Sequence, residues 1–183
     1  MKKIWLIGLI ISTVGLWSNF GFAGNFKPSS EPSGFRGIKW GTDIKTLKDM
    51  KYSRTDPDCG GIKVYTRKDD DLHIGAAKLE RIEYHFWRGK FCSLWIIMKG
   101  QVNYHALRDV CLEKFGKVDY KFFDSGGDKC SFIYFWFDKI TFMFLEYWEP
   151  SEKARLRMGS EKISGQQRAY DKQKAKEGAE RGF

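Results

Sequence analysis

The sequence predicts an α+β domain with an antiparallel sheet built from two helix-plus-hairpin units, helices on one face and a further helix at the C-terminus. Three observations predict this class: two segments typical of β-hairpins, a helical segment ahead of each, and a polar end rich in Lys, Arg and Glu. A length of 183 residues and a hydrophobic content of 42% suit one domain with a real core.

The first unit is expected between residues 42 and 99. Thr42 is a candidate N-cap, and the apolar spacing of Ile44, Leu47 and Met50 predicts a short helix over 42–50. A strand is expected over 62–67. Residues 79–87 then alternate between apolar and polar, a turn follows at 88–90, and 91–99 return as an apolar strand. This pattern predicts a hairpin.

The second unit is expected between residues 101 and 148. Leu107, Cys111 and Phe115 share one face of a helix over 101–115, and Gly116 ends it as a C-cap glycine. A second hairpin joins strands over 130–137 and 140–148. The unit therefore repeats the order of the first.

The rest of the chain divides into three segments. Residues 1–23 are expected to be a signal peptide, residues 24–34 a flexible linker ahead of the 35–150 domain, and residues 151–183 a basic helical tail that is partly disordered. Pro150 suits the first turn of that helix, which we expect to fray beyond Gly165.

The N-terminus indicates the compartment. A Lys-Lys start, an apolar run over 4–17 and small residues at Gly21 and Ala23 are the three parts of a secretory signal peptide. The alternative is an uncleaved N-terminal anchor, for which the apolar run is short. We expect a periplasmic or secreted protein.

The net charge of +9 bears on the partner. Much of the excess lies in the tail, where nine basic residues face five acidic ones. For an exported protein this favours anionic envelope polymers or a membrane surface over nucleic acid, which export disfavours. A solvated basic helix without any partner is the alternative.

The four cysteines predict disulfides, because an even number in an exported chain is typical of them. Pairing of Cys111 with Cys130 and of Cys59 with Cys92 joins neighbouring segments. One pair with two buried thiols is the alternative. The absence of any C-x-x-C spacing argues against a thioredoxin-type or zinc site.

The sequence offers no defined catalytic residues, metal ligands or cofactor motif. It has three histidines and no G-x-S-x-G elbow. Residues 69–71 are three aspartates whose spacing is not that of a calcium loop. A small envelope hydrolase or thiol-dependent enzyme, for example through Cys111 and His85, is the alternative to a non-catalytic protein.

Aromatic density in the second hairpin is the most unusual feature. A sheet with one solvated face should alternate apolar and polar residues, and 132–137 and 142–148 do not. Either both faces are covered, or one face is an aromatic binding surface. The candidate surface residues are Trp95, Tyr134, Trp136, Tyr147 and Trp148.

The stretch GFRGIKWG over 34–41, followed by Thr42-Asp43 and later by Lys114-Phe115-Gly116, resembles a family of uncharacterised exported bacterial proteins that open F-x-G-I-x-W-G. The layout of two helix-plus-hairpin units is similar to that of the β-lactamase inhibitory proteins and the related outer-membrane assembly lipoproteins. The resemblance implies action by protein contact, although the lipidated cysteine of the lipoproteins is missing.

The sequence therefore predicts an exported non-catalytic binding domain. Its expected partner is a protein or an anionic envelope polymer, bound through the aromatic sheet surface, with the basic tail as an auxiliary contact.

Overall fold

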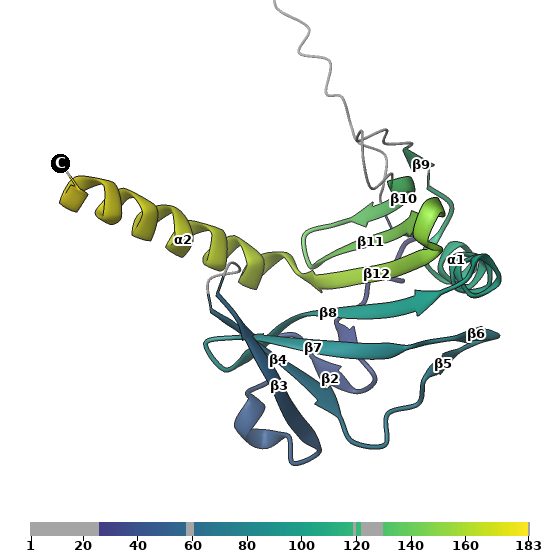
Figure 1. Ribbon diagram of the computed structural model, residues 1–183, viewed down its shortest axis with the longest axis horizontal. Helices are drawn as coiled ribbons and strands as arrows, with labels where there is room; N and C mark the ends of the chain where they lie inside the picture. The colour runs from purple at the N-terminus through teal and green to yellow at the C-terminus, as the bar shows by residue number, and fades with distance from the viewer. Residues whose placement is uncertain (1–25, 58–60, 119, 122–129, 183) are drawn as a thin grey trace, which may run out of the picture.

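The computed structural model describes residues 26–57, 61–118, 120–121 and 130–182. One antiparallel sheet of eight strands dominates it (Figure 1). In spatial order the strands are β3 (Met50–Asp56), β4 (Ile62–Arg67), β7 (Arg81–Trp87), β8 (Lys90–Lys99), β12 (Lys153–Ser160), β11 (Thr141–Trp148), β10 (Cys130–Phe137) and β9 (Tyr120–Lys121).

Shorter elements complete the chain. Two small ladders pair β1 (Gly34–Phe35) with β2 (Ile38–Lys39) and β5 (His73–Ile74) with β6 (Ala77–Lys78). The helices are the 3-10 turns η1 (Ile44–Thr46) and η2 (Glu149–Ser151) and the α-helices α1 (Gln101–Phe115) and α2 (Glu161–Gly182).

The predicted fold class is wrong, because the described residues form mainly one antiparallel sheet with two α-helices and not two helix-plus-hairpin units. Both hairpins and α1 are present, but the expected helix over 42–50 is only the turn η1, and β3 begins at Met50. The backbone there bonds to another part of the chain: Ile44 N–H donates to the Gly89 carbonyl (2.8 Å) and Phe91 N–H to the Thr42 carbonyl (2.9 Å). These tertiary hydrogen bonds determine the conformation of this segment, although its apolar residues have helical spacing. The layout of two helix-plus-hairpin units, on which the similarity to the β-lactamase inhibitory proteins was based, is therefore not present in the described residues.

The second correction concerns the tail. Pro150 lies in the short turn η2, and the chain then forms β12, which lies between β8 and β11 in the sheet. Along β12, Ala154, Leu156 and Met158 are buried, while the residues between them carry the charges. Apolar residues at every second position are typical of a strand, although so short a set of apolar residues is also compatible with a helix. The C-terminal helix therefore begins at Glu161.

One face of the sheet, called here the covered face, carries the main core. Alternate residues of β7, β8, β12 and β11 point to it, and α1 packs on them with Tyr104, Leu107, Cys111 and Phe115. The indole N–H of Trp136 donates to the Gly116 carbonyl at 2.9 Å and so ties β10 to the end of α1.

Residues 26–41, called here the strap, complete the cover. Where the sequence predicts a flexible linker, Phe26 is buried with its ring centroid 5.8 Å from that of Phe115. The Nε1–H of Trp40 donates to the Pro32 carbonyl at 2.9 Å. Lys27 N–H donates to the Phe115 carbonyl at 2.7 Å. Apolar burial and backbone bonds thus hold a segment whose composition is typical of a loop.

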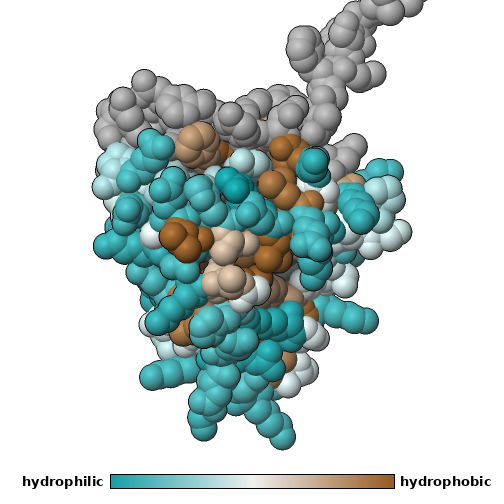
Figure 2. Space-filling view, turned by 90° about the vertical axis from the view of Figure 1, so that its right-hand side faces the viewer, coloured by the Kyte–Doolittle hydropathy of each residue, from teal (hydrophilic) through white to brown (hydrophobic). Residues whose placement is uncertain are grey.

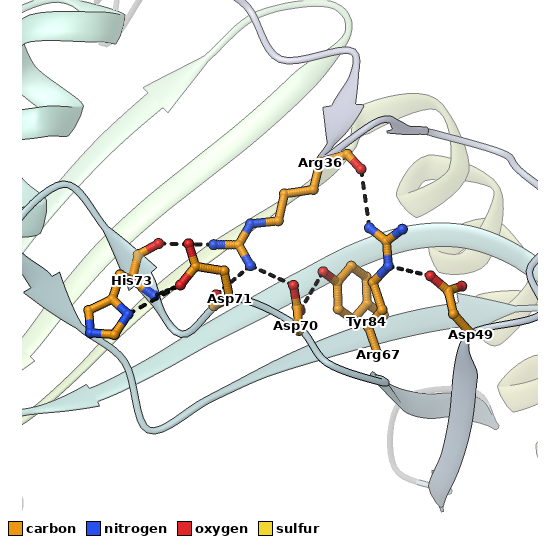
Figure 3. A network of polar contacts seen from close by, with 7 residues as sticks. All are labelled: Arg36, Asp49, Arg67, Asp70, Asp71, His73 and Tyr84. Atoms are coloured by element: carbon orange, nitrogen blue, oxygen red, sulfur yellow. Dashed lines mark hydrogen bonds and ion pairs between the residues drawn. The ribbon is translucent and has the colours of Figure 1, made fainter.

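A polar network fastens the strap to the sheet (Figure 3). The guanidinium of Arg36 donates to the Asp70 carboxylate at 2.5 Å and to the His73 carbonyl at 3.0 Å, and the buried Tyr84 hydroxyl donates to the other Asp70 oxygen at 2.8 Å. Burial, and then the Asp70 carboxylate beside it, raises the pKa of Tyr84. Tyr84 is therefore a neutral donor at physiological pH.

Among the described residues, helix α2 packs on the sheet through its first half, with Ile163 and Tyr170. Ile163 contacts the cluster formed by Ile62, Val64, Trp87 and Cys92, and the helix then projects away from the sheet (Figure 1). None of the helices in the described part of the chain is long and apolar enough to cross a membrane. The side of the molecule that carries α1 is mostly hydrophilic, with apolar residues gathered near its centre (Figure 2).

Gly159 generates a prediction about β12. A Cβ at this position would lie 2.7 Å from Cζ of Phe142 and 2.8 Å from the Cys92 carbonyl oxygen. We expect Gly159→Ala to lower the free energy of unfolding by about 1–3 kcal/mol, because the neighbouring strand must move. Urea denaturation measures the change.

Gly165→Ala is the matched control, because its Cβ would meet nothing closer than 3.9 Å within α2. Alanine is the better helix former, so this variant should gain up to about 1 kcal/mol. Equal effects of the two alanines would contradict the close approach of β12 to its neighbours.

Candidate binding face of the sheet

The face of the sheet opposite α1, called here the open face, is defined by register. Directly opposite residues in adjacent antiparallel strands point to the same side. One such row runs Glu83, Trp95, Arg157, Phe144 and Phe135 from β7 to β10. The next row, on the same face, contains Arg81, Ile97, Arg155, Glu146 and Ile133. The open face thus combines charged and aromatic side chains.

Glu83 anchors the first charged group. Its side chain is 4% exposed, and its two oxygens accept from Arg54 at 2.9 and 3.1 Å and from Arg81 Nε at 2.8 Å. Arg54 reaches it from β3, two strands away in the sheet. Both arginines remain about half exposed, so the carboxylate lies beneath guanidiniums that face the solvent.

The environment of Glu83 fixes its charge. Burial raises the pKa of this carboxyl, but His85, Arg54 and Arg81 beside it lower the pKa by more. The net result is a pKa well below that of ordinary glutamate. Glu83 is therefore ionised at physiological pH and keeps both arginines in place.

Glu146 repeats the arrangement on β11. Its side chain is 7% exposed, and it accepts from Arg155 Nε at 3.0 Å and from Arg157 at 2.9 Å. Arg155 and Arg157 are neighbours on the same side of β12, so one carboxylate holds both. Because charge-assisted bonds are strong, the two guanidiniums have defined positions.

Aromatic rings and a guanidinium stack across the open face. The ring centroids of His85 and Trp95 are 4.7 Å apart, and the guanidinium carbon of Arg155 lies 4.6 Å from the Trp95 centroid and 5.1 Å from that of Trp148. These are cation–π distances. The stack runs from β7 to β11 and joins the two charged groups.

A phenylalanine group continues the open face onto β10 and β11. Phe137 and Phe144 meet edge to face at 5.1 Å, and Phe142 lies 5.8 Å from Phe144. Arg157 lies 5.1 Å above the Phe144 ring. These side chains are only half-buried. They give the open face an apolar region beside its basic one.

A shallow hollow of about 370 Å³ lies over the basic region. Arg54, Arg81 and Arg155 line it together with Trp95 and Trp148. Lys153 adds a further positive charge at its edge. The arrangement can receive an anionic group, which guanidiniums bind with directional hydrogen bonds.

The five predicted surface residues separate between the two faces. Trp95 and Trp148 lie half-buried on the open face. Trp136 is 0% exposed, Tyr147 is 4% exposed and stacked on Tyr104 at 4.5 Å, and Tyr134 packs against the same core. These last three point to the covered face, because their positions along β10 and β11 alternate with those of the phenylalanines. Trp136 and Tyr147 are therefore core residues, and Tyr134 is half-buried against that core.

Sequence reasoning missed the charged residues of the site. The helical tail predicted over 151–183 includes Arg155 and Arg157, and the sequence prediction assigns no role to Glu146. The signal that could have found them is the alternation of charged and apolar residues over 153–158, which matches a strand. Arg54 joins the site only through the sheet order.

The described cysteines do not resemble nucleophiles. Cys92 and Cys111 are buried free thiols; burial raises the pKa of Cys92 to about 11 and that of Cys111 to about 12. The Cys92 thiol donates to the His85 carbonyl at 3.2 Å and not to its ring. Because Cys92 and Cys111 are free in this structure, the preferred pairs Cys59–Cys92 and Cys111–Cys130 are not formed. Cys59 and the side chain of Cys130 lie outside the described residues, so the alternative of one pair with two buried thiols stays a prediction.

The aspartates over 69–71 have structural partners. Asp70 accepts from Arg36 and Tyr84, and Asp71 accepts from the His73 backbone N–H at 3.0 Å (Figure 3). Among the described residues, no three His, Cys, Asp or Glu side chains gather into a group that could hold a metal ion.

The chain shows no match to any family model, curated protein or solved structure with which it was compared.

Replacement of Glu83 tests the buried carboxylate. We expect Glu83→Gln to lower the free energy of unfolding by about 2 kcal/mol at neutral pH, because its charge-assisted bonds are lost while the arginines stay solvated. Glu161→Gln at the start of α2, where a half-buried carboxylate accepts from the exposed Arg168, is the matched control and should cost less than about 0.5 kcal/mol.

The same pair of variants predicts a pH dependence. Since the pKa of Glu83 is lowered on folding, its stabilisation is complete above the ordinary glutamate pKa of about 4.3 and declines as the pH falls below it. The difference in unfolding free energy between the wild type and Glu83→Gln should therefore shrink below about pH 4. A constant difference from pH 7 to pH 3 would contradict the lowered pKa.

Proposed function

We propose that this protein is an exported non-catalytic domain that binds an acidic protein partner through the open face. One observation carries the proposal: half-buried tryptophan and phenylalanine side chains occupy a sheet face on which buried carboxylates hold arginines in fixed positions. Within the described residues, only the first half of α2 packs onto a corner of this face.

The apolar content of the open face supports a partner. A solvated sheet face is ordinarily polar, whereas here Trp95, Ile97, Phe144 and Trp148 are presented together. Contiguous apolar surface on a small protein is typical of an interaction site. Tryptophan, phenylalanine and arginine are also the residues enriched where protein interfaces are most strongly bound.

The charge of the open face supports an acidic partner. Arg54, Arg81, Arg155, Arg157 and Lys153 exceed the two carboxylates Glu83 and Glu146. In the part of the chain that the structure describes, Arg81 and Arg155 each donate a hydrogen bond through Nε only. Their terminal N–H groups are therefore available to a partner carboxylate.

The stack on the open face favours a protein over a polysaccharide. A sugar ring binds tryptophan through the flat face of the indole. Here Arg155 lies over the rings of Trp95 and Trp148, and His85 lies against Trp95, so these faces are already in contact with other side chains. A rigid surface that offers guanidinium donors and apolar edges suits a protein surface better. The N-terminal sequence has the pattern of a signal peptide, which supports a partner in the envelope or outside the cell; residues 1–23 lie outside the described residues.

Site-specific photocrosslinking in the native host tests this proposal. A photoreactive amino acid at Ile97, in the hollow, should give one protein cross-link of defined mass. The same amino acid at Val102, which is 82% exposed on α1, is the matched control and should not. Cross-linking of polysaccharide at Ile97, or the same products at both positions, would contradict a protein partner.

Charge reversal at the edge of the hollow provides the second test. Lys153 is exposed and, in the described structure, has no ion-pair partner, so Lys153→Glu should leave the fold unchanged. We expect it to reduce the Ile97 cross-link several-fold, because charges at an interface rim control association. Lys78→Glu, on β6 away from the open face, is the control and should keep the cross-link.

A further inference from the structure

A second cavity lies on the other side of the sheet. Its volume is about 500 Å³, and it lies between α1, the strap and the covered face, open to solvent on one side. Ile96, Leu156 and Met158 form its floor from the sheet, and Leu107 and Cys111 line it from α1. The proposed partner surface uses none of these residues.

The size and lining of this cavity match a small-molecule site. Ligand pockets have volumes of about 300–1,000 Å³ and are mostly apolar with a few polar groups at defined positions. The floor residues are aliphatic and almost fully buried, and the apolar surface open to a ligand comes from the half-buried lining residues Phe35, Ile74 and Val110. The apolar part of the lining favours apolar groups over water, because it offers water no hydrogen-bond partners.

The strap makes the site preformed. Its roof over the cavity is held by the hydrogen bond of Trp40 to the Pro32 carbonyl and by that of Lys27 to the Phe115 carbonyl. The Thr141 hydroxyl donates to the same Pro32 carbonyl. Arg36 fixes the far end of the roof through Asp70 (Figure 3). A ligand therefore enters a site that requires little ordering.

Three charged side chains lie at the rim. Arg36 is paired with Asp70, which leaves Lys114 and Glu31 as the charges open to a ligand. Lys114 has, in the described part of the chain, no carboxylate at ion-pair distance; its ammonium lies 5.4 Å from the Phe115 centroid. It is also close enough to Cys111 to lower the pKa of that thiol against the larger effect of burial.

We propose that this cavity binds a single acyl chain with an anionic head group, such as a fatty acid. The chain lies above the aliphatic floor, against Phe35, Ile74 and Val110, and the carboxylate pairs with Lys114. The carboxylate of Glu31 repels the head group. Removal of the Lys114 charge and removal of the Glu31 charge should therefore change binding in opposite directions. This site shares no residue with the proposed partner surface, so either proposal can be disproved while the other stands.

Titration with a fluorescent fatty acid tests the cavity. The purified protein should bind the probe saturably with a one-to-one stoichiometry. Val110 lies on α1 at the mouth and is half-buried, so Val110→Trp should block entry and weaken binding at least about tenfold. Val102→Trp, on the same helix at an exposed position, is the matched control and should bind as the wild type does.

The rim charges provide a test that needs no change in the cavity. Lys114→Gln should weaken the carboxylate probe several-fold but leave the alcohol of the same chain unaffected, and Glu31→Gln should strengthen the carboxylate probe. Non-saturable partition of the probe, equal binding by the two tryptophan variants, or equal effects on acid and alcohol would overturn the proposal.

Discussion

The position of β12 between β8 and β11 is the constraint on which the rest of this structure depends. The two hairpins are separate units along the chain, and β12 pairs with both of them through continuous antiparallel ladders. Its backbone approaches them so closely at Gly159 that a Cβ would contact both neighbouring strands. Without this strand the sheet would end at β8 and at β11, and neither its core nor its open face would be continuous.

The two faces of β12 carry two different kinds of chemistry. Leu156 and Met158 belong to the buried core and to the floor of the acyl cavity, while Arg155 and Arg157 belong to the open face. Because strand residues alternate, one short segment supplies both. Substitutions on one face therefore leave the other face's contacts in place, which allows the two proposed sites to be tested independently.

The arginines of the open face depend on carboxylates buried beneath them. Glu83 and Glu146 are almost inaccessible, yet each is surrounded by guanidiniums that remain partly in water. Burial of an unpaired carboxylate is costly, so each acid requires its arginines as much as it positions them. The result is a surface with fixed donors, which loses little conformational entropy when a partner binds.

The sequence by itself determined the local elements: both hairpins, the helix α1 with Gly116 at its end, and the alternation that separates Tyr84 from Glu83, since each depends on neighbours a few residues apart. Only the tertiary structure decided that 42–50 is no helix, that 153–160 enters the sheet, and that Trp136 is core while Trp95 is surface. Those outcomes depend on backbone hydrogen bonds and cover supplied by segments far away in the chain. A local pattern shows which residues share a face, but which face is covered is settled only when the sheet is assembled.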